Sequence, residues 1–293
     1  MKSYPVFEDL RFEDLAIFNK EFLDNPPSIS EYTFTNLYAW REPYKLKACL
    51  LGRFIILRSE AGPQMRFFDP IGTGDKKSVM EEIFQKDNGI FVRLPEETIA
   101  LFSNDPRFQV GLDRDNSDYL YKAEELITLQ GAKYDGKRNR IKKFRSTCGY
   151  EYIPMTAMNA QECMAYEDQW CILKNCDGVE GLSHERQAIR EMTKHFLDFE
   201  LVGGAIKIEG MIRAVALAQR LNPETLVMHV LKADATLSGL YQTMLHEFLS
   251  REAGNYLYVN FEQDLGEAGL RKSKQSYHPL KMIQKYTLIP TLV

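Results

Sequence analysis

The sequence predicts a mixed α/β protein built from two domains. Its 293 residues exceed the usual size of one domain, and a content of 44% hydrophobic and 12% aromatic residues is enough for two packed cores. Short β-branched and aromatic runs alternate with longer segments in which apolar residues recur every three or four positions. A meander of strands followed by a helix and another strand occurs in each half, so we expect two related halves.

The first half is predicted to begin with two helices and to continue with the meander. The expected elements, in order, are helices at 8–23 and 31–40, strands at 45–51, 54–59 and 65–69, a helix at 76–85, a strand at 90–93 and a helix at 96–102. Gly72 and Gly74 stand between the meander and the next helix. Their backbone N–H groups could hold an anion, but a tight turn capped by Asp75 explains the same pattern.

The second half has clearer boundaries because turn residues separate its strands. Glu209-Gly210 and Asn222-Pro223 interrupt a run of apolar segments, and Gly254 stands where a helix cap belongs. The expected elements are helices at 159–171 and 185–199, strands at 204–209, 213–221 and 226–231, a helix at 237–248, a strand at 256–261, a short helix at 266–276 and a strand at 281–288.

A basic segment connects the two halves. Residues 121–150 contain eight Lys or Arg against three acids, although the whole chain has a net charge of −4. We therefore expect domains at 1–125 and 151–293 with a linker helix at 126–150. Arg138, Lys142 and Arg145 follow one another at spacings of four and three, which places them on one helical face that could bind phosphates. A solvated helix face is the competing interpretation.

Two acids follow the predicted strand at 256–261. If the backbone is still extended there, Glu262 and Asp264 lie on the same face, where they could orient an attacking amine or take its proton. In the alternative interpretation, Asp264 caps the next helix and Glu262 is a solvated strand end. In open α/β sheets ligands bind where strands leave the core, so this segment is the candidate site.

Further polar residues follow on the short helix and after it. Arg271 and Lys274 share one face at a spacing of three and could clamp a phosphate or carboxylate. Tyr277 and His278 come next, and His278 could transfer a proton near neutral pH. The competing interpretations are solvated charges for the first pair and structural hydrogen bonds for the second.

Three segments carry a resemblance to a known family. They are 30–41, 126–144 and 260–279. Together they resemble the bacterial family that shares the catalytic C-terminal domain of phosphatidylglycerol lysyltransferase, which is similar to the Fem-type aminoacyltransferases and to the GNAT fold used twice in one chain. The resemblance implies two GNAT-like domains in tandem, with aminoacyl transfer from a donor such as aminoacyl-tRNA to an amine or hydroxyl of a small-molecule, peptide or lipid acceptor.

The resemblance also suggests roles for single residues. It implies that Tyr277 protonates the leaving group and that Arg138, Lys142 and Arg145 contact the phosphates of tRNA. Many GNAT enzymes place a base where His229 stands in its strand, although a hydrogen-bonded core histidine is the simpler interpretation. We expect the basic stripe of residues 138–145 and the 262–278 segment to line one cavity.

Two alternatives remain open at the level of the sequence. A CoA-dependent N-acyltransferase would use a glycine-rich loop to hold pyrophosphate, but residues 232–239 contain one glycine and Asp234, which disfavours acetyl-CoA there. Gly72 and Gly74 of the first half could supply such a loop. The second alternative is a ligand-binding or regulatory module without catalysis.

Composition excludes several other classes. The longest apolar runs, such as 214–218, are far too short to cross a membrane, and residues 1–9 lack an apolar signal core, so we expect a cytoplasmic protein. The five cysteines show no CxxC pair and are expected to be reduced thiols. The histidines have no metal-ligand spacing, and we expect no bound metal.

Overall fold

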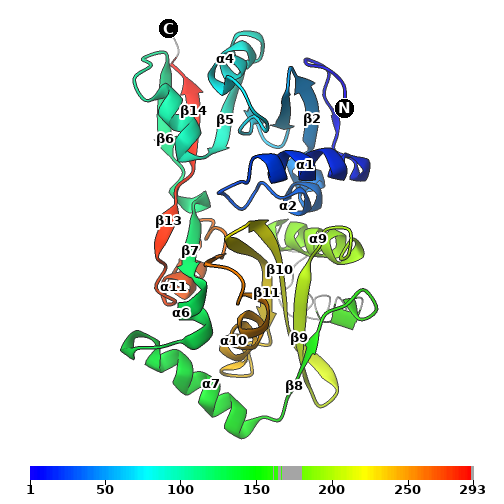
Figure 1. The fold of residues 1–293 in the computed structure, drawn as a ribbon, viewed down its shortest axis with the longest axis vertical. Helices are drawn as coiled ribbons and strands as arrows, with labels where there is room; N and C mark the ends of the chain where they lie inside the picture. The colour runs from blue at the N-terminus through cyan, green and yellow to red at the C-terminus, as the bar shows by residue number, and fades with distance from the viewer. Residues whose placement is uncertain (161, 164–165, 167–179, 292–293) are drawn as a thin grey trace. The chain divides into compact units, whose positions relative to one another are not determined.

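A computed structural model describes the chain except for residues 161, 164–165, 167–179 and 292–293. Two compact units are each assembled from separate stretches of the sequence (Figure 1). The first unit comprises Met1–Asp118, Gln263–Ala268 and Met282–Val293, and the second comprises Tyr119–Glu262 and Gly269–Lys281. The division into linear domains at residues 125 and 150 remains a prediction.

The first unit contains a mixed seven-stranded sheet. Its strand order is β1-β2-β3-β4-β5-β14-β6, with β1 Glu8–Asp9, β2 Leu46–Leu51, β3 Phe54–Ser59, β4 Met65–Phe67, β5 Gly89–Leu94, β6 Phe108–Leu112 and β14 Tyr286–Pro290. β4 and β5 are parallel and the other neighbours are antiparallel. Phe67, Phe91 and Leu288 from this sheet are buried in one apolar cluster with Met80 and Ile83.

Helices of the first unit surround this sheet. They are η1 Phe12–Asp14, α1 Leu15–Asp24, α2 Phe34–Ala39, α3 Arg41–Tyr44, α4 Lys76–Lys86, α5 Glu96–Ile99, η2 Ala100–Phe102 and η3 Arg114–Asn116. Met80 and Ile83, three residues apart on α4, are the pair that this helix buries against the sheet. The N-terminus of α4 is capped by Asp75, which accepts the Ser78 N–H at 3.1 Å.

The second unit also contains a mixed seven-stranded sheet. The strand order is β13-β7-β12-β11-β10-β9-β8, with β7 Asp118–Lys122, β8 Glu151–Pro154, β9 Val202–Ile208, β10 Met211–Asn222, β11 Thr225–Ala233, β12 Tyr258–Asn260 and β13 Lys281–Ile283. Its helices are α6 Ala123–Thr128, η4 Ala132–Tyr134, α7 Asp135–Thr147, α9 Glu180–Lys194, α10 Leu240–Glu252 and α11 Ala268–Gln275. β12 runs parallel to β11 and antiparallel to β7.

The predicted fold class, two mixed α/β domains of GNAT-like type in tandem, is confirmed. The central strands and helices of each half lie within a few residues of their predicted positions, because strong apolar periodicity specified them. The segment 8–23 differs from its prediction: it opens with β1, which pairs with β2, and the α-helix begins at Leu15. The expected strand at 281–288 is two strands, and β14 joins the first sheet. Part of the helix predicted at 159–171 lies outside the described residues.

Helix α7 packs closely against the start of α10 within the second unit. Gly239, the residue before α10, has φ +94°, and a Cβ built on it would lie 2.6 Å from the carbonyl oxygen of Arg140 in α7. The absence of a side chain at residue 239 therefore permits the contact. No helix in the described part of the chain is long and apolar enough to span a bilayer.

Replacing Gly239 by alanine is expected to lower the free energy of unfolding by about 2–3 kcal/mol, because it adds a steric clash to a left-handed backbone conformation. Gly210→Ala is the matched control, since Gly210 has φ +78° but an added Cβ would meet no atom within 4 Å. That control should cost only about 1 kcal/mol. Urea unfolding of both variants measures the difference, and equal losses would show that α7 does not press on Gly239.

Candidate active site

The candidate site lies where two parallel strands of the second unit end their pairing. β11 and β12 are paired from Thr225 with Tyr258 to Val227 with Asn260, after which β12 stops and β11 continues to Ala233. His229 and Glu262 each follow the last paired residue of their strand by two positions. Their side chains meet, with His229 Nδ1 2.9 Å from Glu262 Oε1. The end of the parallel pairing is therefore bridged by a histidine and a carboxylate.

A buried asparagine sets the direction of the chain at Glu262. The Asn260 side chain is fully buried, and its Oδ1 accepts the Glu262 N–H at 2.7 Å. Glu262 adopts φ +54°, which is a left-handed conformation and not an extended one. The expectation that Glu262 and Asp264 share a face of an extended strand is therefore wrong.

The two members of the pair differ in accessibility. The side chain of His229 is 0% exposed, whereas that of Glu262 is 20% exposed. His229 Nε2 also lies 3.3 Å from Gln219 Oε1 on the neighbouring strand β10, so contacts at both ring nitrogens hold the imidazole. Glu262 therefore presents the accessible side of the pair, and His229 lies buried behind it.

Asp264 occupies a structural position in the first unit. Its side chain is 0% exposed, Oδ2 lies 3.1 Å from Arg114 Nη1, and Oδ1 accepts the Gly266 N–H at 2.9 Å. A buried carboxylate with an arginine partner and a backbone N–H stabilises the turn at 264–266. Asp264 therefore holds the turn at 264–266, which precedes the first residue of α11, Ala268.

The residues of α11 connect that helix to the sheet. Lys274 donates a hydrogen bond to the carbonyl oxygen of Phe261, and its own carbonyl accepts one from the Tyr121 hydroxyl at 2.8 Å. Arg271 lies on the same helix, three residues earlier, and is half-buried. These contacts tie α11 to the backbone of Phe261, the residue before Glu262, and to Tyr121 of β7.

Tyr277 and His278 differ strongly in their environment. Tyr277 is 3% exposed, its hydroxyl has no hydrogen-bond partner among the described residues, and burial raises its pKa well above the ordinary value. His278 is exposed, and its Nε2 lies 3.1 Å from the carbonyl oxygen of Lys133. The environment of His278 matches the structural interpretation of this residue.

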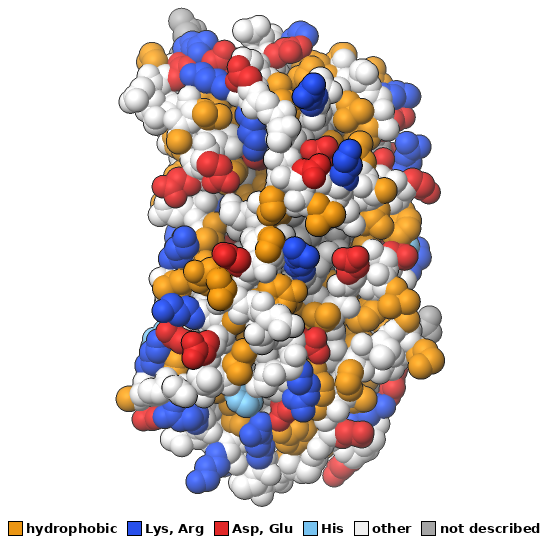
Figure 2. All heavy atoms as spheres, viewed as in Figure 1, with side chains coloured by type: hydrophobic (Ala, Val, Ile, Leu, Met, Phe, Trp, Pro, Cys, Tyr) orange, Lys and Arg blue, Asp and Glu red, His pale blue; other side chains and the backbone are white. Residues whose placement is uncertain are grey.

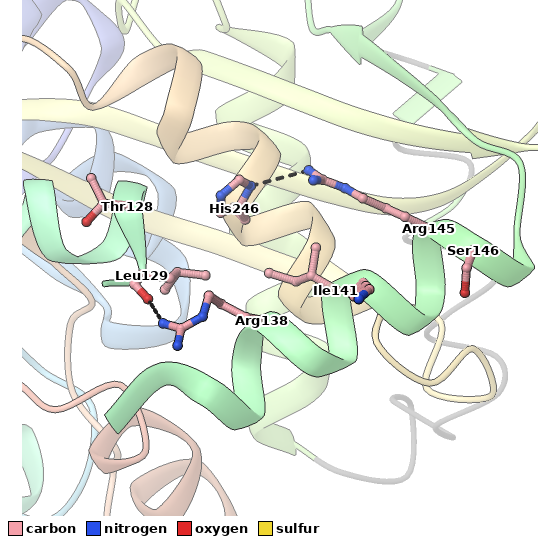
Figure 3. A pocket seen from close by; sticks show the side chains of 8 residues that line it. Thr128, Leu129, Arg138, Ile141, Arg145, Ser146 and His246 are labelled. Carbon is pink, nitrogen blue, oxygen red and sulfur yellow. Dashed lines mark hydrogen bonds between the residues drawn. The ribbon is translucent and has the colours of Figure 1, made fainter. Parts of the chain in front are cut away.

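The predicted basic stripe lines a groove. A cavity of about 520 Å³ is formed between α6, α7 and α10 (Figure 3). It is lined by Thr128, Leu129, Arg138, Ile141, Lys142, Arg145, Ser146 and His246. Figure 2 shows Lys and Arg side chains gathered over the lower part of the drawn face, where α7 lies in Figure 1. The structure thus brings all three residues of the stripe to one hollow, which we call the basic groove.

The cations of the basic groove are held to different extents. Arg145 lies 2.6 Å from Glu247 Oε1 and 3.1 Å from the Tyr150 hydroxyl, and Arg138 donates to the carbonyl oxygens of Leu129 and Gly131. Lys142 is exposed. Burial, together with the charge of Arg145, lowers the pKa of His246. Lys142 is therefore the cation with the greatest freedom to meet an anion.

Among the described residues, the basic groove is not shared with the 262–278 segment. None of the residues that line the basic groove belongs to the 262–278 segment. One face of α7 lines the groove, and Lys137 on an adjoining face donates a hydrogen bond to Ser276, the residue after α11. The sequence could not predict this division, because it depends on the packing of α7 against both α10 and α11.

The glycines of the first half have a packing role. Gly72 and Gly74 both have φ +140°, and an added Cβ would lie 2.7 Å from the carbonyl oxygen of Arg53 at Gly72 and 3.2 Å from the Phe54 ring at Gly74. Protein atoms therefore fill the space that their missing side chains leave. In the second half, Asp234 lies 3.3 Å from Arg213 and accepts the Thr236 N–H, which closes the loop before α10.

A buried ion cluster in the first unit was not anticipated. Lys285 Nζ lies 2.5 Å from both Glu31 Oε2 and Asp118 Oδ1, and the side chains of Lys285 and Asp118 are 0% exposed. Ser30 donates its hydroxyl to Asp118 at 2.9 Å. The 30–41 segment contains Glu31, but Asp118 and Lys285 lie 87 and 254 residues further along the sequence. The pattern of that segment therefore could not identify them as its partners. In the described part of the chain no group of His, Cys, Asp and Glu is arranged to hold a metal ion, and Cys171 and Cys176 lie outside it.

Comparison with known proteins identifies one matching family and several similar solved structures. A family described as phosphatidylglycerol lysyltransferase, C-terminal, matches residues 25–289. A conserved protein of unknown function from Bacteroides thetaiotaomicron is 33% identical, with a TM-score of 0.90 over 97% of this chain and 99% of that one. The structure of L-PGS from Bacillus licheniformis shares 16% identity and a TM-score of 0.66, over 97% and 93% of the two chains.

Two further relatives are more distant. FemX shares the fold, with a TM-score of 0.58 at 9% identity over 98% of this chain and 97% of the other. An uncharacterized protein of Mycoplasmoides gallisepticum is 23% identical over 175 residues, which are 58% of this chain and 55% of that protein. The match therefore spans about half the length of this relative.

Proposed function

Since the chain belongs to the family of the phosphatidylglycerol lysyltransferase C-terminal domain, we propose that it transfers an aminoacyl group from an activated donor such as aminoacyl-tRNA. The acceptor would be an amine or hydroxyl of a small molecule, peptide or lipid. The observation that carries the proposal is the His229–Glu262 pair at the point where β11 and β12 stop pairing. A fold can host many activities, so the support for this chemistry comes from the pair and not from the fold alone.

Glu262 is proposed as the general base. The acceptor oxygen or nitrogen attacks the ester carbonyl carbon of the donor while the partly exposed Glu262 carboxylate takes its proton. A new C–O or C–N bond forms, the ester C–O bond breaks, and the leaving hydroxyl of the donor takes up a proton. His229, buried beneath Glu262, holds the carboxylate in one orientation and does not itself contact the substrate.

We assign no acid role to Tyr277 in this scheme. Its hydroxyl is buried within the protein, and the shift of its pKa keeps it protonated. Asp264 and His278 are likewise left with the structural contacts described above. Water at the open end of the strands is the simplest proton source for the leaving group.

The basic groove is proposed to contact phosphates of the tRNA donor. Arg138, Lys142 and Arg145 line one hollow, and cations in a row along a helix suit a phosphodiester backbone. Acetyl-CoA is less well supported than aminoacyl-tRNA as the donor. The backbone of α7 covers Gly239 at the start of α10, and protein atoms pack against Gly72 and Gly74, so neither loop offers an open cradle for pyrophosphate at its glycines.

A donor comparison tests the proposal. The purified chain is incubated with tRNA charged with radiolabelled amino acids or with labelled acetyl-CoA, together with amine, peptide and lipid acceptors. Transfer of label from tRNA to an acceptor is the expected result. Transfer from acetyl-CoA alone would overturn the donor assignment, and tight binding of tRNA without transfer in any mixture would overturn the enzymatic function in favour of a binding module.

Removing a groove cation should weaken tRNA binding in a salt-dependent manner. Lys142→Ala is expected to reduce by about one the slope of log association constant against log salt concentration, because one phosphate contact is lost. Lys143→Ala is the matched control, since Lys143 is an exposed neighbour on α7 that does not line the groove. Fluorescence anisotropy with labelled tRNA at several salt concentrations measures both slopes. Identical slopes for the two variants would place the tRNA elsewhere.

A further inference from the structure

Lys137 of α7 has an unusual environment for a lysine. Its Nζ donates a hydrogen bond to Ser276 Oγ at 2.5 Å and lies 3.8 Å from the centre of the Tyr277 ring. Both partners are uncharged, and the residue is half-buried. The amine therefore lies in a confined position between α7 and the segment that follows α11.

No carboxylate balances the charge of Lys137 in the described part of the chain. Lys133, four residues earlier in the chain, differs from Lys137 because it has a carboxylate partner: its Nζ lies 2.5 Å from Glu125 Oε2. Arg140, three residues along α7 from Lys137, brings a like charge. Burial, followed by this arginine, lowers the pKa of Lys137 to about 8. Since Tyr277 keeps its proton, Arg140 and the neutral groups at Ser276 and Tyr277 are what the amine faces.

We propose that Lys137 is a nucleophilic amine that becomes acylated by activated acyl donors of the acyl phosphate or acyl ester class. The neutral amine attacks the carbonyl carbon, and an N–C bond forms as the C–O bond to phosphate or alcohol breaks. The leaving oxygen departs with the bonding electron pair, and the amine loses a proton to water. The product is an Nε-acyl lysine. A desolvated lysine beside another cation is the arrangement that activates amines in enzymes.

The proposal does not depend on the transferase function. A chemical donor reacts with an activated amine whether or not the chain transfers aminoacyl groups. Acylation would remove the ammonium from the Tyr277 ring and place an acyl group where α7 meets the residues after α11. Since the adjoining face of α7, which includes Arg138 and Ile141, lines the basic groove, a modification here is positioned to influence that groove.

Acetyl phosphate is the probe for the test. The intact folded chain is treated with a limiting amount between pH 6 and 10, and acetylation of each lysine is followed by peptide mass spectrometry. Lys142 and Lys143 are the internal controls, because both are exposed on the same helix. At pH 7 Lys137 should react roughly tenfold faster than either, since a far larger fraction of its amine is neutral. Its rate should level off above about pH 8–9 while those of the controls continue to rise.

Two comparisons show whether Lys137 reacts quickly because its amine is activated or only because it is accessible. In urea the advantage of Lys137 should disappear, because it depends on the folded environment. Ser276→Asp should abolish it by adding a carboxylate beside the amine, whereas Gln275→Glu, at an exposed neighbour, should leave most of it. A wild-type Lys137 that reacts no faster than Lys142 and Lys143 at pH 7, or whose rate rises in parallel with theirs up to pH 10, would overturn the proposal.

Discussion

Replacing Lys285 by methionine is expected to lower the free energy of unfolding by about 3–5 kcal/mol, the usual cost of removing one member of a buried ion pair. The Lys285 ammonium is fully buried and lies within 2.5 Å of the carboxylates of Glu31 and Asp118. Methionine matches the length of the lysine stem but removes the ammonium from Asp118 and Glu31, of which Glu31 keeps the Arg93 guanidinium at 3.1 Å. Urea unfolding followed by circular dichroism measures the loss.

The exposed pair of Lys86 and Glu82 provides the control for this prediction. Their atoms lie 2.6 Å apart on α4, and the side chain of Lys86 is 56% exposed, so Lys86→Met should cost at most about 1 kcal/mol. A loss for Lys285→Met that is no greater than this would show that the buried cluster contributes little to stability.

The deficit of Lys285→Met should also depend on pH. Burial raises the pKa of Glu31 even in the intact protein. A carboxyl with a raised pKa in the folded state binds its proton more readily there than in the unfolded chain, so its contribution to stability is lost as the pH rises. The deficit should therefore shrink as the pH is lowered from about 7 toward 4. A deficit that stays constant over this range would argue against uncompensated carboxylates as its cause.

Replacing Glu262 by glutamine is expected to reduce the rate of aminoacyl transfer by about 10²–10⁴-fold, the usual contribution of a general base. Glutamine preserves the size of the side chain and can still contact His229, but it cannot accept the proton of the acceptor. The transfer assay with charged tRNA measures the rate. Binding of tRNA should remain unchanged, because the basic groove is lined by other residues.

Glu267→Gln is the matched control for Glu262→Gln. Glu267 is an exposed acid five residues further along the chain and should tolerate the change. Thermal unfolding of both variants checks that the fold is preserved. Full transfer activity in Glu262→Gln would remove Glu262 from the catalytic scheme, and an equal loss in both variants would point to a general effect of charge.

The role of the 30–41 segment illustrates a limit of motif interpretation. Its pattern indicated the family, but its contacts are structural: Thr33 caps α2 by accepting the Asn36 N–H, and the Asn36 side chain donates to the carbonyl oxygen of Ser30. Ser30 and Glu31 then meet Asp118 and Lys285. A recurrent motif can therefore report a folding constraint as readily as a substrate contact.

Local pattern was sufficient for the repeating elements of both halves and for the stripe on α7. The spacing of apolar residues predicted strands such as β3 and β10 and helices such as α4 and α10, because backbone geometry imposes these periods on any amphipathic segment. Arg138, Lys142 and Arg145 lie in one groove for the same reason. The polar segment after β12 was also identified correctly as a place where the chain leaves a buried strand.

Contacts between residues distant in sequence could be found only from the folded chain. The pairing of His229 with Glu262, the burial of Lys285 with Glu31, and the entry of β14 into the first sheet all depend on which apolar faces pack together. Hydrogen bonds between strands and ion pairs between buried side chains form after that packing brings them close. Periodicity along the chain carries no information about such partners, since it describes one segment at a time.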